Sequence, residues 1–498
     1  MSLVDVLSSI SFGQRVAEDE AGELANYFVE TDLWRRLFRG EVDVIYGPKG
    51  SGKSALYTLL ITRKDALFDR NILLVPGENP RGATAFKDLV TDPPTSERQF
   101  VGLWKLYIAS LVADVFDEYG LKGSNASQFR EVLEKEGLIK RGKTLSGLLR
   151  SVFDYVKGAI RPEALEGSMD IDPISGLPKS FKGKITFREP SQSALEHGYI
   201  SIDSLFEVAN QALSENKFEF WILLDRLDVA FVESQELEHN ALRALFRTYL
   251  DVLAFEHIRL KIFLRSDIWK RITSGGFREA SHITRSMTIS WDARTLLNLL
   301  VSRSIKNAAI MEYYKLTKDD VLNSTIAQNE FFYKMFPEQV EIGPNKSKTF
   351  DWLLNRTMDG TRQNAPRELI HLLNTLREVQ IRLLEIGSIP PDNEELFSRT
   401  AFKDALYEVS RTRLEQTIYA EYPTIKPLIE VLRRERTNQS VGTLSKIWRV
   451  SDEVAAAYAD QLVEHGIFEL RGTKDFPNYW VPFLYRDALE MIQGTAEE

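Results

Sequence analysis

The sequence predicts an α/β fold class: a core built on a parallel sheet, then a helical lid, then a C-terminal winged-helix domain. In the first 291 residues, short and nearly continuous apolar runs alternate with helix-like stretches. This alternation is typical of parallel sheets, and continuous apolar runs are typical of strands that helices cover on both faces. Near the C-terminus, helices precede two short extended pieces around a polar turn, which is the element order of a winged helix.

Five apolar segments are the predicted strands of the core. They cover residues 41–47, 71–77, 218–225, 259–267 and 286–291. Apolar residues at spacings of three and four predict helices before and between the strands, at residues 14–40, 99–119, 200–214 and 236–253. The pattern fails where prolines and glycines cluster at 161–195, so we interpret residues 120–200 as an insertion with a small helical unit near 140–157.

Helical spacing dominates the rest of the chain. Helices are predicted at residues 292–312, 347–357, 364–386 and 400–418. A chain of 498 residues is too long for a single hydrophobic core. We therefore predict four regions: an N-terminal helical segment at 1–40, a core at 41–291 that contains the insertion, a lid at 292–395 and a winged-helix domain at 396–498.

The composition excludes several classes of protein. The chain has no cysteine, which excludes disulfides, cysteine-ligated zinc and iron–sulfur clusters. Its net charge of −9 argues against a general nucleic-acid coat, although a local basic patch stays open. The N-terminus lacks the pattern of a signal peptide, and no apolar run approaches the roughly 18 residues that span a bilayer. We expect a cytoplasmic protein with no membrane partner.

The most specific segment of the sequence is YGPKGSGKSA, residues 46–55. It has the spacing G-x-x-x-x-G-K-S between a predicted strand and a predicted helix, the setting of a phosphate-binding loop. Glycines let backbone N–H groups converge on phosphate oxygens, the lysine bridges the β- and γ-phosphates, and the serine hydroxyl binds Mg²⁺. The alternative is a glycine-rich turn with an exposed lysine. The predicted nucleotide-binding residues are Gly47, Pro48, Lys49, Gly50, Ser51, Gly52, Lys53, Ser54 and Ala55.

A carboxylate at the end of a neighbouring strand completes such a site by holding the Mg²⁺ ion. Asp225 follows the apolar run WILL, so Asp225 and Ser54 are the predicted metal ligands. The next residue is Arg226, where many hydrolysing P-loop proteins have a glutamate that polarises the attacking water. Asp228 is the best remaining catalytic carboxylate, with Glu233 behind it; alternatively, Asp228 forms a surface ion pair with Arg226. Hydrolysis is therefore expected to be slow or to depend on a partner.

Two arginines complete the predicted catalytic set. Arg265 ends the strand KIFLR, at the sheet edge where ligands bind in open α/β folds. Alternatively, it forms a salt bridge with Asp267 at the end of the strand. Arg367 follows Pro366 in the first turn of a predicted helix, where an arginine can face a phosphate. Alternatively, it is a solvated helix residue.

This order of motifs resembles the ATPase superfamily that contains the AAA+ proteins, with the origin-recognition, STAND and KAP ATPases as the nearest groups. More closely, the chain resembles a bacterial family of P-loop ATPases often found in mobile and antiphage defence regions, through ANYFVETDLW, YGPKGSGKSAL, FVGLWKLYI, GKITFREPS and WILLDRLDVAF. The resemblance implies ATP and Mg²⁺ as ligands, hydrolysis to ADP and phosphate, and sensor roles for Arg265 and Arg367. Arg226 and Arg265 depart from the residues common in the superfamily.

With this resemblance, the residues predict a regulated ATPase that acts as a switch or assembly platform in a multi-protein antiphage system. The expected partners are proteins encoded nearby and further copies of the chain, whose Arg278 or Arg285 would complete the site. Two alternatives stay open: a DNA-engaging loader and a non-hydrolysing scaffold that keeps ATP as a fixed ligand. Residues 421–498 carry nine basic and thirteen acidic side chains, whereas DNA-binding modules usually carry a basic stripe. DNA is therefore the weaker expectation.

Overall fold

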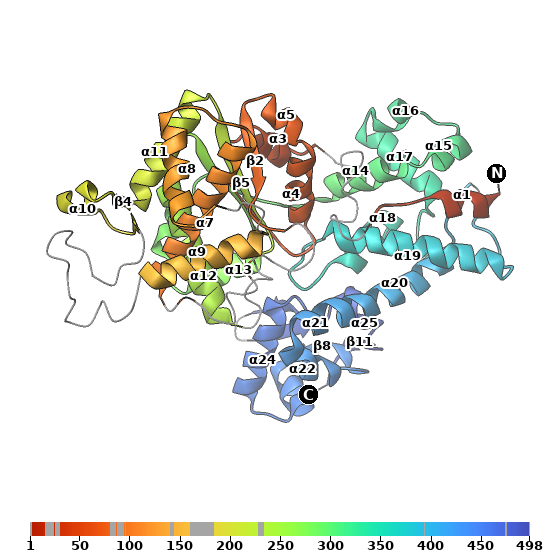
Figure 1. Cartoon of the computed structure of the whole chain (residues 1–498). Helices are drawn as coiled ribbons and strands as arrows, with labels where there is room; N and C mark the ends of the chain where they lie inside the picture. Colours follow the sequence, from red (N-terminus) through yellow and green to blue (C-terminus); the bar gives the residue numbers. More distant parts are fainter. Residues whose placement is uncertain are drawn as a thin grey trace. The chain divides into compact units, whose positions relative to one another are not determined.

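The computed structural model describes residues 2–14, 24, 30–79, 86, 94, 96–139, 144–159, 184–227, 234–392, 394–473 and 476–497. The contacts between residues divide the chain into two compact units, each with most of its contacts inside itself (Figure 1). The first, here called the α/β unit, contains Glu30–Pro48 and Lys53–Ile289. The second, here called the helical unit, contains Met1–Val29, Lys49–Gly52 and Ser290–Glu498. The boundaries of the four predicted regions stay a prediction.

The α/β unit is built on one five-stranded sheet in which all neighbouring strands are parallel. The strand order is β2-β5-β6-β1-β7. All five strands lie where the sequence predicts them: β1 (Val44–Gly47), β2 (Ile72–Pro76), β5 (Glu219–Leu224), β6 (Ile258–Arg265) and β7 (Ser286–Thr288). β1 and β5 are buried almost throughout, as expected of strands covered on both faces.

Helices cover both faces of this sheet. Figure 1 shows α7, α8 and α11 on one side of β2 and β5, and α3, α4 and α5 on the other. The helices of this unit include α3 (Asp32–Phe38), α4 (Lys53–Thr62), α5 (Lys64–Phe68), α7 (Glu97–Glu118), α8 (Ser124–Lys135), α9 (Leu145–Ala159), α11 (Ile202–Glu215), α12 (Gln235–Val252) and α13 (Ser266–Ser274). Three predicted helices of the core are confirmed as α7, α11 and α12.

Helix α7 is the central helix of this unit. Among the described residues it is the one helix whose length and composition would suit a bilayer, yet 89% of its apolar window is buried inside the protein, as in a core helix. α9 packs against it, and α8 packs against α11. The described part of the predicted insertion therefore shares the hydrophobic cluster of the core. The small helical unit predicted near 140–157 is present as α9, and it is followed by α10 (Gln192–Glu196) between two short parallel strands, β3 (Ile185–Thr186) and β4 (Ile200–Ser201).

A buried ion network lies at the amino end of β1. Asp43 and Lys261 are both inaccessible to solvent, and Lys261 Nζ donates to Asp43 Oδ1 and to the Val42 carbonyl at 2.7 Å each. Arg285 Nε donates to Asp43 Oδ2 at 2.5 Å, and the Lys261 ammonium lies 4.2 Å from the ring centre of Trp221. Burial lowers the pKa of Lys261 to about 8, although Asp43 opposes this shift. The network joins β1, β5, β6 and the residue before β7.

The helical unit contains the helices predicted beyond residue 291. Their bounds are α14 (Ala293–Ser304), α15 (Ala308–Tyr314), α16 (Lys318–Leu322), α17 (Thr325–Met335), α18 (Thr349–Thr357), α19 (Pro366–Glu385) and α20 (Arg399–Arg413). The single helix predicted at 292–312 is two helices, because the Asn307 side chain donates to the carbonyls of Arg303 and Ser304 and so ends α14. In the predicted N-terminal helical segment, α1 (Leu3–Ser9) packs on α15 and α19.

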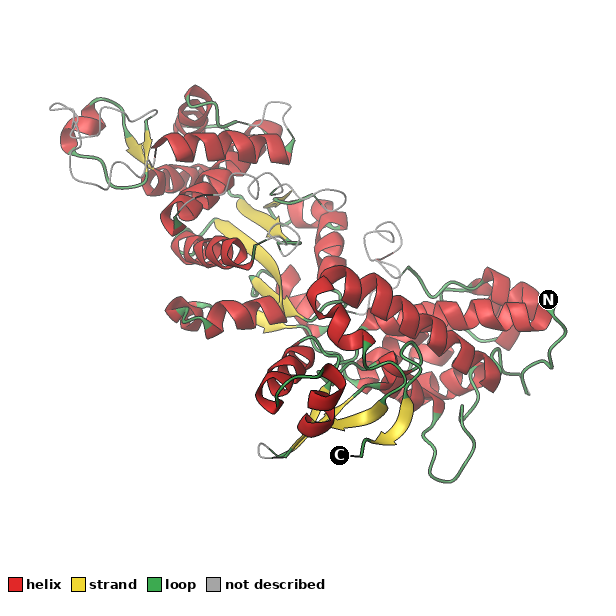
Figure 2. Ribbon diagram, turned by 90° about the horizontal axis from the view of Figure 1, so that it is seen from below, coloured by secondary structure: helices red, strands yellow, loops and turns green. Residues whose placement is uncertain are grey.

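The end of the helical unit has the winged-helix order that the sequence predicts. Figure 2 shows its strands in yellow beside the C-terminus, in the sheet order β11-β8-β10-β9. Its elements are α22 (Lys426–Glu430), β8 (Arg436–Ser440), α23 (Val441–Trp448), α24 (Asp452–Glu464), β9 (Glu469–Gly472), β10 (Pro477–Trp480), α25 (Phe483–Arg486) and β11 (Ile492–Thr495). The predicted fold class is therefore confirmed: a parallel-sheet α/β core, many helices and a C-terminal winged helix.

The loop that precedes α19 is packed closely on the winged helix. The Gly360 N–H donates to the Gly466 carbonyl at 2.7 Å, and Arg362 Nε donates to Glu469 Oε1 at 2.8 Å. A side chain on Gly360 would lie 2.2 Å from the Phe468 carbonyl oxygen, which leaves room only for glycine. The loop before α19 and the winged helix therefore share a tightly fitted junction.

Candidate nucleotide-binding site

The predicted phosphate-binding loop has the strand–loop–helix setting that its sequence requires. β1 ends at Gly47, and α4 begins at Lys53. Gly50 and Gly52 have φ angles of 78° and 102°, in the left-handed region that favours glycine. Lys53 Nζ donates to the carbonyls of Gly47 and Pro48 at 2.9 Å each. The ammonium group therefore folds back over the loop, at the start of a helix whose N-terminal amides attract anions.

The tip of the loop belongs, by its contacts, to the helical unit. Ser51 is buried, and its carbonyl accepts the indole N–H of Trp291 at 2.8 Å. A Cβ on Gly50 would lie 3.1 Å from the Cβ of Arg367, so these two residues are in close contact. The loop tip is thus fixed by groups from two separate parts of the helical unit.

The other predicted loop residues lie at the surface of the loop or on the first turn of α4. Lys49 forms an ion pair with Glu421. Lys53, Ser54 and Ala55 are half-buried on the first turn of α4. Their partial exposure leaves the ammonium and hydroxyl groups within reach of a ligand. The nucleotide-binding and metal-binding roles of these residues stay predictions.

Asp225 follows β5 directly and is buried, with 5% of its surface exposed. The carboxyl ends of parallel strands meet at one edge of a sheet, where ligands bind in open α/β folds. Asp225 and Ser54 offer a carboxylate and a hydroxyl oxygen, the hard oxygen donors that suit Mg²⁺. Across the described ranges, no group of three or more metal-ligating side chains is arranged to hold an ion by itself. A Mg²⁺ ion here would take its other ligands from phosphate oxygens and water.

Arg226 reaches the end of the neighbouring strand β2. Its backbone has a φ of 57°, in the left-handed region, and its Nη1 donates to the Asn79 carbonyl at 3.2 Å. The guanidinium thus binds the chain just beyond β2. Asp228 and Glu233 lie outside the described residues. The catalytic role of Asp228, and its alternative pairing with Arg226, therefore stay predictions.

Two buried tyrosines hold the end of β2. Tyr107 of α7 donates to the Gly77 carbonyl at 2.7 Å, and Tyr57 of α4 donates to the Glu78 carbonyl at 2.8 Å. Burial raises the pKa of both tyrosines. The negative charges of Asp225 and Glu78 raise the pKa of Tyr57 further, and the charge of Glu78 also raises the pKa of Tyr107. Glu78 is itself buried, with 1% of its surface exposed. Sequence reasoning missed it, although it follows its predicted strand as directly as Asp225 follows β5.

Arg265 lies beside the start of the loop. In the register of β1 and β6 it is the partner of Gly47. Its guanidinium also binds Asp267 with two hydrogen bonds, of 3.1 and 2.9 Å. Burial would raise the pKa of Asp267, but Arg265, together with Arg271 and a backbone hydrogen bond, lowers it. The structure thus shows the Arg265–Asp267 salt bridge, which was the alternative interpretation. It also places Arg265 at the sheet edge that the sensor role requires. The sensor role stays a prediction.

Arg367 occupies the first turn of α19, after Pro366, as the sequence predicts. Its Cβ contacts Gly50, as described above. The next residue, Glu368, is buried and accepts a hydrogen bond from Arg413 Nη1 of α20 at 2.8 Å. Burial alone would lower the pKa of Arg413, but Glu368 raises it. The first turn of α19 therefore contacts the loop tip through Arg367 and α20 through Glu368.

The two arginines considered for a neighbouring subunit differ in their surroundings. Arg285 donates to Asp43 and to the Gly40 carbonyl, at the amino end of β1. The phosphate-binding loop lies at the opposite, carboxyl end of β1. Arg278 is exposed on a short 3₁₀ helix, Arg278–His282. Of the two, Arg278 therefore fits the role better, because Arg285 is bound into the ion network.

Three arginines near the winged helix are paired with acidic neighbours. In the wing, Arg471 donates to both oxygens of Glu469 at 2.7 and 3.0 Å, and its guanidinium lies 3.8 Å from the ring centre of Trp480. Arg433 and Arg434 form exposed ion pairs with nearby glutamates. Exposed pairs contribute only about 0–1 kcal/mol, so such arginines remain able to change partners.

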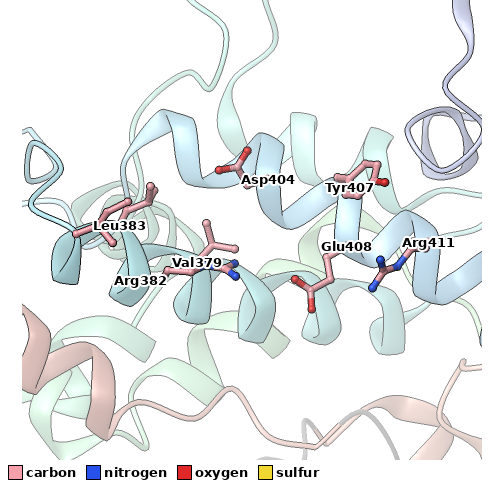
Figure 3. Close-up of a pocket in the computed structure, with 8 residues that line it drawn as sticks. Val379, Arg382, Leu383, Asp404, Tyr407, Glu408 and Arg411 are labelled. Atoms are coloured by element: carbon pink, nitrogen blue, oxygen red, sulfur yellow. The ribbon is translucent and has the colours of Figure 1, made fainter.

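A groove lies between α19 and α20 (Figure 3). It has a volume of about 470 Å³. Its lining combines arginines and carboxylates with apolar side chains, namely Val379, Arg382, Leu383, Ile386, Asp404, Tyr407, Glu408 and Arg411. None of these residues was predicted as a site residue. The groove therefore adds nothing to the candidate site.

The sequence matches no protein-family profile and no curated protein. Among solved structures, the chain is similar to the Aeropyrum pernix ORC1 protein in complex with DNA, at 12% identity and a TM-score of 0.35, over 92% of this chain and 91% of that one. It is also similar to the Aeropyrum pernix ORC2 protein (ADPNP-ADP complexes), at 14% identity and a TM-score of 0.35, over 96% of this chain and 93% of that one. Such low scores carry no argument about function, which rests on the site itself.

Proposed function

We propose that this chain binds ATP with Mg²⁺ at the loop Gly47–Ala55 and hydrolyses it to ADP and phosphate. The observation that carries this proposal is the loop between β1 and α4, with a lysine and a serine at the start of the helix and two left-handed glycines in the turn. Backbone amides of such a loop converge on phosphate oxygens. A buried carboxylate at the end of β5 supports the metal-binding half of the proposal.

The residues divide the work as follows. Lys53 leaves its two carbonyl partners and binds the β- and γ-phosphate oxygens, while the α4 amides bind the same anion. Ser54 and Asp225 hold the Mg²⁺ ion, which neutralises negative charge on the phosphates when bound. Arg265, in register with Gly47, contacts the γ-phosphate from the neighbouring strand. Its bond to Asp267 orients the guanidinium for that contact.

The nucleotide acts as a signal through α19. Arg367 touches the loop at Gly50, and the adjacent Glu368 holds Arg413 in a buried pair. A change in the loop tip on nucleotide binding would move Arg367 and the first turn of α19 and, with them, the winged helix packed at the same junction. This arrangement supports a regulatory switch or assembly platform. Its cytoplasmic location, protein partners and further copies of the chain are expectations from the sequence. The antiphage setting rests on the sequence resemblance alone.

Calorimetric titration with ATP and Mg²⁺ tests the binding proposal. The wild-type chain is expected to bind, and Lys53→Ala is expected to weaken binding by about 10- to 100-fold, since a hydrogen bond to a charged group contributes about 1.5–3 kcal/mol. Lys318→Ala is the matched control, because Lys318 is an exposed lysine of α16. No heat of binding at millimolar ATP would overturn the proposal.

Two alternatives have their own tests. A DNA-engaging role predicts ATP-dependent DNA binding that weakens steeply with salt; the winged-helix fold is the observation that favours it. No binding at about 50 mM salt would remove this role. A non-hydrolysing scaffold predicts no phosphate release in a single turnover. Release that Asp225→Ala abolishes would exclude the scaffold.

A further inference from the structure

Three consecutive backbone carbonyls beyond β2 are each bound by a side chain. The Gly77 carbonyl accepts from Tyr107, the Glu78 carbonyl from Tyr57, and the Asn79 carbonyl from Arg226, over 2.7 to 3.2 Å. These donors come from α7, from α4 and from the residue after Asp225. The consequence is that the backbone of Glu78 is fixed in position.

The register places Glu78 beside Asp225. β2 and β5 run parallel, with Pro76 paired to Leu223, and the Gly77 N–H donates to the Leu223 carbonyl at 2.8 Å. Two residues further along each strand, this register brings Glu78 level with Asp225. Both residues are buried, with 1% and 5% of their surfaces exposed. Two buried acidic residues therefore lie level with each other at the carboxyl edge of the sheet, and Glu78 Oε1 accepts the Asn79 N–H at 2.7 Å.

The α4 helix connects this pair of carboxylates with the phosphate-binding loop. Tyr57 lies one helical turn after Lys53 on α4, and its hydroxyl touches the Glu78 backbone. The side chain that follows Asp225 in the sequence is Arg226, whose positive charge cannot accept a proton from water. Its guanidinium instead holds Asn79, the residue next to Glu78. The arginine thus occupies the position of the usual glutamate while positioning a carboxylate from the neighbouring strand.

We propose that Glu78 is the carboxylate that activates the attacking water in ATP hydrolysis. This inference rests on the ATPase function proposed above. The Glu78 carboxylate accepts one proton from the water as the water oxygen bonds to the γ-phosphorus. The bond between the γ-phosphorus and the β,γ-bridging oxygen breaks, and ADP leaves with the electron pair. Arg226, Tyr57 and Tyr107 are positioning residues that fix the base.

Single-turnover phosphate release with Glu78→Gln tests this role. Glutamine keeps the shape and the hydrogen-bonding oxygen, so ATP affinity is expected to stay within a few-fold of wild type. Release is expected to slow by about 100- to 10,000-fold, the range for loss of a general base. Glu238→Gln is the matched control, because Glu238 is also a buried carboxylate of the α/β unit, paired with Arg271. Thermal unfolding of each variant confirms that it is folded.

Comparison with Asp228→Asn separates the two candidate bases. If Asp228→Asn abolishes release while Glu78→Gln leaves it at the wild-type rate, the Glu78 proposal is wrong and the ATPase function stands. If the wild-type chain binds ATP but releases no phosphate, the Glu78 proposal fails and only nucleotide binding survives. Absence of ATP binding by the wild type would instead overturn the proposed function.

Discussion

Replacing Asp43 with asparagine is expected to destabilise the α/β unit strongly. The carboxylate accepts hydrogen bonds from Lys261 and Arg285, and Asp43 and Lys261 are fully buried. In Asp43→Asn, the Lys261 ammonium keeps the Val42 carbonyl, the face of Trp221 and a neutral amide oxygen in place of Asp43 Oδ1, but it loses its opposite charge. Leaving one buried charge without its opposite charge lowers the free energy of unfolding by about 3–5 kcal/mol. The expected loss is therefore several times that of an exposed ion pair.

Urea unfolding followed by circular dichroism measures this loss. The double variant Asp43→Asn/Lys261→Met removes the stranded charge and is expected to recover part of the stability. Asp251→Asn is the matched control: Asp251 is a half-exposed carboxylate, and Lys105 keeps its second partner, Asp203, so about 0–1 kcal/mol is expected. A loss below about 1 kcal/mol in Asp43→Asn, or a double variant no more stable than the single one, would refute the reasoning.

The same network gives stability a definite dependence on pH. The pKa of Lys261 is about 8 in the folded protein, against 10.5 for an ordinary lysine. Between these values the unfolded chain binds more protons than the folded one, so the free energy of unfolding contributed by Lys261 rises with pH. In Asp43→Asn this rise is expected to begin at lower pH, because the carboxylate that favours the charged lysine is gone. Unfolding titrations at several pH values check the sign.

Three further predictions concern the loop and the wing. Gly50→Ala places a side chain on a left-handed backbone and against Arg367, so it is expected to weaken ATP binding in calorimetry. Gly387→Ala is the control: Gly387 has the same φ of 78° but no atom near its Cβ position, so ATP affinity is expected to stay unchanged. Arg226→Ala is expected to lower the rate of phosphate release more than ATP affinity, with partial rescue by lysine. Burial would raise the pKa of Glu469, but Arg471 and Arg362 lower it. The ion pairs of Glu469 with these arginines are therefore expected to be lost as the pH falls through that lowered pKa. Hydrogen exchange of the β9 amides would report this loss.

Local patterns were sufficient to predict most of the core. Four of the five strands of the sheet, β1, β2, β5 and β6, are short apolar runs that end in, or are followed by, glycine or a charged residue. Such continuous apolar runs are expected where helices cover both faces of a sheet. β8 and β11 were missed because RTNQS and IQGT are polar and show no alternation. Their strand character comes from pairing within the winged helix, which is a long-range property.

The candidate site was predictable where one segment carries it. The loop Gly47–Ala55 was predicted from the spacing of its glycines, lysine and serine, and Asp225 from the apolar run that precedes it. Glu78 could not be recognised, because its importance comes from the register of β2 against β5, which the sequence does not reveal. The purpose of Arg226 was equally hidden: its partner, Asn79, lies 147 positions away in the chain. Contacts over such distances require the fold.

The indole of Trp291 gives this protein an internal optical probe. Its N–H donates to the Ser51 carbonyl, in the middle of the phosphate-binding loop, so any rearrangement of that loop changes the polarity around one tryptophan. Rapid mixing with nucleotide can therefore follow loop motion by intrinsic emission, without an attached dye. Subtracting the signal of a Trp291→Phe variant would isolate this residue from the other seven tryptophans of the chain.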